Sequence, residues 1–149
     1  MQTLQNTIKE LALRIVPHYI YGTPYYINTQ TDRMRAKGQM PACLHIQTSD
    51  GSFTLTDGNY FQSRKDTHRV QVGFADAVKF DRDPETTIAK VDDLLSKGFQ
   101  LVKSLSDRGP WTVDEPVTYE VLYDTQDGNL VWVLLTFNVT DVVGKCLAP

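Results

Sequence analysis

The alternation of apolar and polar residues near the end of the chain predicts a β-hairpin. Val117–Val139 contains two runs rich in β-branched and aromatic side chains, separated by a polar turn that includes Asp127 and Gly128. Asp-Gly pairs favour the tight turns of hairpins, and such runs are typical of strands. We therefore expect two antiparallel strands in this region.

The first residues show the spacing of an amphipathic helix. Thr3 is a candidate N-cap, and Pro17 is expected to close the element. The apolar residues that fall on one helical face are Leu4, Ile8, Leu11, Ala12 and Ile15.

A second, longer helix is predicted from Pro84 to Leu105. Asp83 supplies an N-cap, Pro84 suits the first helical position, and Glu85 places an acid in the first turn. Gly98 interrupts this helix, so we expect a bend or a tight packing contact there. The predicted apolar stripe consists of Ile88, Val91, Leu94, Leu95, Val102 and Leu105.

The remaining patterns predict further strands and two polar excursions. Residues 41–48 and 52–56 flank a Ser-Asp-Gly turn and predict another hairpin, and the alternation in 69–75 predicts a strand. Residues 59–68 are expected to form a projecting polar arm, and 18–37 an extended segment followed by an exposed loop. The fold class is therefore α+β: an antiparallel or mixed sheet with an N-terminal helix and one long helix packed on it.

Composition supports one globular domain over residues 1–149. Hydrophobic residues make up 41% and charged residues 22%, and the formal net charge is -3. Residues 1–70 hold eight basic and five acidic side chains, whereas 71–149 hold seven and thirteen, so different faces are expected to differ in sign. Cys43 and Cys146 are expected to be reduced thiols, and the chain shows neither an export signal nor a long apolar span.

No local motif carries chemistry. His18, His45 and His68 are too scattered to form a zinc-binding pair, and no nucleophile elbow or nucleotide-binding glycine pattern occurs. We therefore expect no catalytic residue, no metal site and no cofactor. The tyrosines at 19, 21, 25 and 26 are interpreted as packing residues rather than a base-stacking platform.

The order of these elements resembles the tail terminator and tail completion proteins of tailed bacteriophages and the related neck adaptors. The resemblance spans nearly the whole chain. It is carried by the first helix, the strand that begins at Pro41, the strand Arg69–Ala75 with its Val-x-Val-x-Phe alternation from Val70, the long helix and the closing alternation Leu134–Val139. The polar regions 19–38 and 48–68 and the segment 144–149 are longer than the family pattern.

This resemblance implies a virion structural protein, made in the host bacterial cytoplasm, that forms a ring of six or twelve copies in the head-to-tail connector or tail. Its expected partners are portal, adaptor or tail proteins above and below, and weakly bound genome DNA in the channel. The side chains expected to face the channel or partners are Arg33, Arg35, Lys37, Arg64, Lys65, Asp66 and Arg69. The candidates for contact between subunits are Tyr60, Phe61 and Trp111.

Two alternatives belong to other classes. One is a small cytoplasmic binding or interaction module whose pocket wall is formed by the aromatic segment Tyr19–Tyr26. The other is an enzyme without a local motif, which requires a buried polar cluster with perturbed pKa values.

Overall fold

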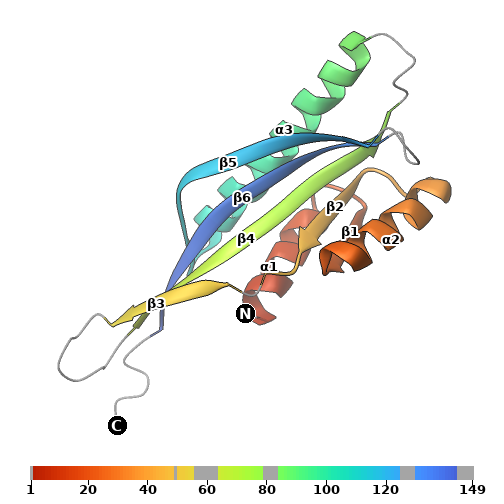
Figure 1. Ribbon diagram of the computed structural model, residues 1–149. Coiled ribbons are helices and arrows are strands. Elements are labelled where there is room, and N and C mark those ends of the chain that lie inside the picture. Colours follow the sequence, from red (N-terminus) through yellow and green to blue (C-terminus); the bar gives the residue numbers. More distant parts are fainter. Residues whose placement is uncertain (1, 49, 56–63, 79–83, 125–129, 144–149) are drawn as a thin grey trace.

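A computed structural model describes residues 2–48, 50–55, 64–78, 84–124 and 130–143, and within them three helices and one six-stranded sheet (Figure 1). The elements, in chain order, are α1 (Gln2–Leu13), β1 (His18–Gly22), α2 (Pro24–Ala36), β2 (Ala42–Ile46), β3 (Gly51–Leu55), β4 (Arg64–Ala77), α3 (Pro84–Arg108), β5 (Thr112–Asp124) and β6 (Leu130–Val143).

The sheet is mixed, with the strand order β1-β2-β4-β6-β5, and the sixth strand, β3, pairs with β4 off this path. Only the pairing of β1 with β2 is parallel among the described strands; the others are antiparallel. The α+β fold class and the closing hairpin are therefore confirmed. A register shift between Asp114 and Thr118 interrupts the β5–β6 ladder, whereas the expected Asp127-Gly128 turn lies outside the described residues.

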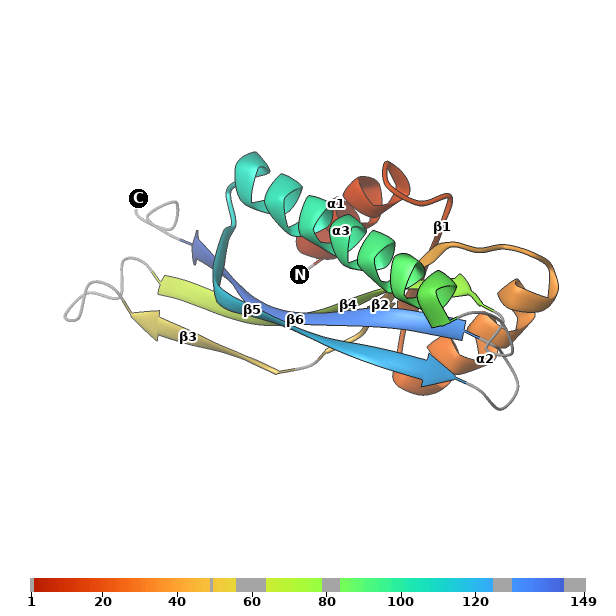
Figure 2. The ribbon, with the colours of Figure 1, turned by 90° about the horizontal axis from the view of Figure 1, so that it is seen from above.

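Helices lie on both faces of the sheet. Figure 2 shows α1 and α3 on one side and α2 on the other. The larger core cluster joins α1, α3 and one sheet face, and the smaller one joins Ile27 and Met34 of α2 to Ala42, Leu44 and Ala75. We call these two sides the α1–α3 face and the α2 face.

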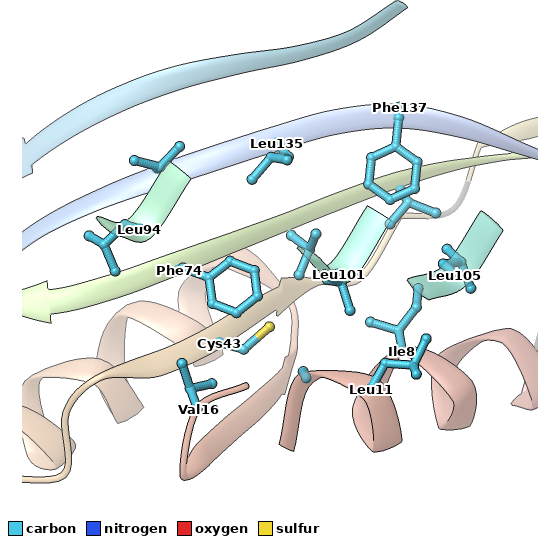
Figure 3. Packing of buried hydrophobic residues seen from close by; sticks show 14 of the residues in the cluster. Ile8, Leu11, Val16, Cys43, Phe74, Leu94, Leu101, Leu105, Leu135 and Phe137 are labelled. Atoms are coloured by element: carbon cyan, nitrogen blue, oxygen red, sulfur yellow. The ribbon is translucent and has the colours of Figure 1, made fainter. Parts of the chain in front are cut away.

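The main core lies under α3 (Figure 3). Leu94, Leu101 and Leu105 are almost completely buried, as are Phe74 and Phe137 on the strands. Gly98 provides the tight contact expected of it, because a Cβ atom added there would lie 2.6 Å from Leu135 Cδ1. The predicted stripe is wrong at Ile88, which is 60% exposed, because that position lies on the side of the helix turned away from the sheet centre.

The expected hairpin over residues 41–56 is wrong. Residues 42–46 pair with 71–75 and residues 51–55 with 64–68, so β2 and β3 follow one another along the same side of β4. The predicted arm is also wrong over residues 64–68, which lie within β4; residues 56–63 are outside the described residues. Pairing with β3 and β6 satisfies the backbone of this polar stretch, so its low hydrophobicity does not prevent strand formation.

The expected loop after β1 is a helix. Thr23 caps α2 by accepting a hydrogen bond from the Tyr26 backbone N–H, and Pro24 occupies the first turn. Ile27, Thr31 and Met34 are buried at helical spacing, although few apolar residues mark this segment. The Thr3 cap is also wrong, because α1 begins at Gln2 and includes Thr3.

Candidate interaction surfaces

A partly buried polar cluster joins β1, β2 and α1. The Tyr19 hydroxyl lies 2.6 Å from His45 Nδ1, the Gln5 side chain donates to the Tyr19 oxygen over 3.3 Å, and the Tyr21 ring lies 4.8 Å from the imidazole. Burial lowers the pKa of His45 to about 4 and raises the pKa of Tyr19 above its usual range. At neutral pH the imidazole is therefore uncharged, and its tautomer sets whether Nδ1 or the Tyr19 hydroxyl donates in this hydrogen bond.

This cluster is a structural feature of the core. His45 is only 6% exposed, and its neighbour Cys43 is fully buried, which raises the pKa of the thiol. Among the described residues, no group of three or more His, Cys, Asp or Glu side chains is arranged to hold a metal ion.

The four tyrosines expected to form a pocket wall are divided between two sides of the sheet. Tyr19 and Tyr21 contact His45, whereas Tyr25 and Tyr26 belong to α2. Tyr25 is 82% exposed, and Tyr26 lies against Gly22. Their arrangement does not favour a common aromatic pocket.

The part of the α2 face beyond α2 is polar. A shallow hollow of about 480 Å³ lies over β3, β4, β6 and β5, and the Arg69 guanidinium forms an ion pair of 3.5 Å with Asp50 at its margin. We call this region the open sheet face; the residues that line it include Thr67, Arg69, Thr118, Thr136 and Asn138. Hydroxyl, amide and guanidinium groups there offer hydrogen bonds without a strong net charge.

The structure separates the predicted channel-facing residues. Strand alternation places Lys65 and Arg69 on the α2 face and Asp66 on the opposite face, while the Arg64 side chain lies outside the described positions. The basic group Arg33, Arg35 and Lys37 lies on the last turn and cap of α2.

Of the three residues expected to make contact between subunits, the structure describes only Trp111. Trp111 is 7% exposed and belongs to the protomer's own core, beside the start of β5. Tyr60 and Phe61 lie outside the described residues.

An exposed apolar surface lies where α3 runs beside β5. Ile88 and Phe99 of α3 are 60% and 68% exposed, and Tyr119 and Tyr123 of β5 are 58% and 56% exposed. We call these four residues the α3–β5 ridge. Half-buried Leu95 and Val121 join it to the core. Sequence reasoning missed this surface, although the apolar residues of α3 span a wider arc than one sheet contact requires.

The two margins of the sheet are strands with an open edge. Among the described strands, β5 pairs only with β6, and β1 only with β2. Their outward backbone N–H and C=O groups are the type of template to which another strand adds. Pro116 and the register shift disrupt the first half of β5, so its regular open edge begins at Thr118.

Opposite charges mark these margins. β5 contains no lysine or arginine and four acidic residues, of which Glu115 and Glu120 are exposed. At the other margin, α2 carries three basic residues against one acid, Asp32, within residues 32–37. The structure therefore places an acidic strand, β5, at one margin of the sheet and the basic end of α2 at the opposite margin.

No protein-family model matches the chain, and no curated protein sequence is significantly similar to it. Within the described residues, none of the helices combines the length and hydrophobicity needed to cross a membrane.

Proposed function

We propose that this chain is a virion structural protein of a tailed bacteriophage, which forms a ring in the head-to-tail connector or tail. The observation that carries this proposal is the α3–β5 ridge beside an open strand edge. The resemblance in element order supplies the biological setting.

The ridge and the edge support self-association. Four large apolar side chains of the adjacent elements α3 and β5 remain more than half exposed, and covering such side chains with a partner is favourable. The two margins of the sheet differ in length, charge and helix cover. A contact between two different margins repeats head to tail, and it closes into a ring when the rotation between copies allows.

The open sheet face suits weak contact with DNA or a neighbouring ring. Lys65 and Arg69 supply positive charge, and Asp50 offsets part of it through its ion pair with Arg69. Phosphate contacts of this type are sequence-independent and weaken with salt. A protein that lines a channel for the genome must bind DNA weakly enough for the DNA to pass.

The protein acts in this proposal without turnover. The His45 cluster, in which burial lowers the pKa of the imidazole, is packed between α1 and the sheet, and His45 is only 6% exposed. An enzyme would need such a group in a cleft with access to solvent.

The test is the composition of the virus particle and the assembly state of the protein. Quantitative mass spectrometry of purified particles of the phage that encodes the chain should find a fixed copy number that fits one ring of six or twelve. Electron microscopy should place that ring between head and tail or at the head-proximal end of the tail. Particles that contain none of the chain would overturn the proposal.

A further inference from the structure

We propose that neighbouring copies join head to tail through opposite margins of the sheet: the α3–β5 margin of one copy binds the β1–α2 margin of the next. This inference rests on the proposed function for its setting. It commits to a second copy of this chain as the partner and identifies the two surfaces that meet.

Strand direction permits this contact. β1 is parallel to β2, and the successive antiparallel pairings β2–β4, β4–β6 and β6–β5 make β1 run opposite to β5. When copies are related by rotation about an axis along the strands, each strand keeps its direction in the next copy. The open edge of β5 then meets β1 of its neighbour in an antiparallel arrangement, which joins the two sheets into one.

The charges of the two margins favour the head-to-tail contact over a two-fold contact between identical margins. Strand alternation places Glu120 on the α2 face, because its neighbour Val121 packs against the core of the α1–α3 face. The basic end of α2 lies on that same face at the opposite margin. Continuation of the sheet from one copy to the next therefore brings acidic and basic groups together, whereas a β5–β5 contact would bring two acidic margins together.

The apolar groups of the two margins support the same pairing. The α3–β5 ridge lies on the α1–α3 face, because Tyr119 and Tyr123 alternate with Glu120 along β5. On that same face the β1–α2 margin supplies the partly exposed rings of Tyr19 and Tyr21. Aromatic side chains of this type are common in the centres of protein interfaces, with charged groups around them. The third open strand, β3, carries no charged residue, so it offers the acidic margin no complementary charge.

Charge exchange tests the contact. Glu120→Lys and Arg33→Glu should each weaken self-association about tenfold, because each places like charges across the contact. The two changes combined in one chain should restore association to within about threefold of the wild type, as should a one-to-one mixture of the single variants. The matched control for Glu120→Lys is Asp107→Lys, which makes the same charge change on an exposed position in the last turn of α3, outside the ridge.

Sedimentation velocity between about 10 and 200 µM protein measures the association, and circular dichroism checks that each variant is folded. A wild type that remains monomeric, single variants that associate like the control, or a combined variant that fails to recover would overturn the inference. Tighter association of Glu120→Lys would instead indicate a β5–β5 contact and would also overturn it.

The two proposals fail in different ways. If particles contain a ring of the chain but Glu120→Lys assembles normally, the proposed function stands and the proposed contact is refuted. Charge-rescued association of a protein that is absent from particles would support the contact and refute the function.

Discussion

His45 shows how one buried residue can set the pH dependence of stability. Its folded pKa of about 4 lies below the unfolded value of about 6.5, so the unfolded chain binds the proton first as the pH falls. Stability should be fully present above about pH 6.5 and should decline toward pH 4, by on the order of 3 kcal/mol for this residue. Urea unfolding at a series of pH values measures the slope.

Two variants separate this effect from the titration of carboxylates. His45→Phe fills the same space without a titrating group and should flatten the slope between pH 6.5 and 4. Leu44→Ala removes a buried side chain that does not titrate, and should lower stability at every pH while leaving the slope as it is. An unchanged slope in His45→Phe would show that other groups control the acid response.

Gly98 tests the close approach of α3 to β6. A side chain there would collide with Leu135 Cδ1, so Gly98→Val should lower the free energy of unfolding by about 2 kcal/mol or more, despite the low helix propensity of glycine. Leu135→Ala alone should cost about 2–5 kcal/mol through its cavity. Because the valine fills part of that cavity, the double variant should cost less than the sum of the two changes, and strict additivity in thermal unfolding would contradict this contact.

At the scale of the element, α3 has one stripe for its own core and another that remains exposed. Leu101→Ala removes a fully buried side chain and should cost about 2–5 kcal/mol. Ile88→Ala, in the same helix, changes a side chain that is 60% exposed and should cost less than about 0.5 kcal/mol in the monomer. Chemical denaturation at low protein concentration compares the two, and equal losses would mean that both stripes are buried in the protomer.

At the scale of the whole molecule, the proposed contact links stability to protein concentration. Association of folded copies should raise the melting temperature as concentration rises, because unfolded chains do not offer the same surfaces. The shift should be smaller in Glu120→Lys than in Asp107→Lys, and high salt should reduce it in the wild type. A melting temperature that does not depend on concentration in the wild type would argue against association through folded margins.

The sequence alone determined the elements whose apolar pattern is strong and local. It placed α1, α3, the final hairpin and the tight packing at Gly98, because helical spacing, strand alternation and a proline-led helix start act within a few residues. It did not reveal α2, whose cap and first proline were visible in Thr23 and Pro24 but whose buried stripe includes only two strongly apolar residues, Ile27 and Met34.

The tertiary structure decided what depends on partners distant in the chain. Residues 64–68 form a strand because β3 and β6 satisfy its backbone on both sides, although the local sequence is polar. The burial of Trp111 and the exposure of Ile88 are also set by which neighbours the fold supplies, rather than by residue type. Charge along the chain was visible from the start, but only the strand order placed acidic and basic residues on opposite margins of one sheet.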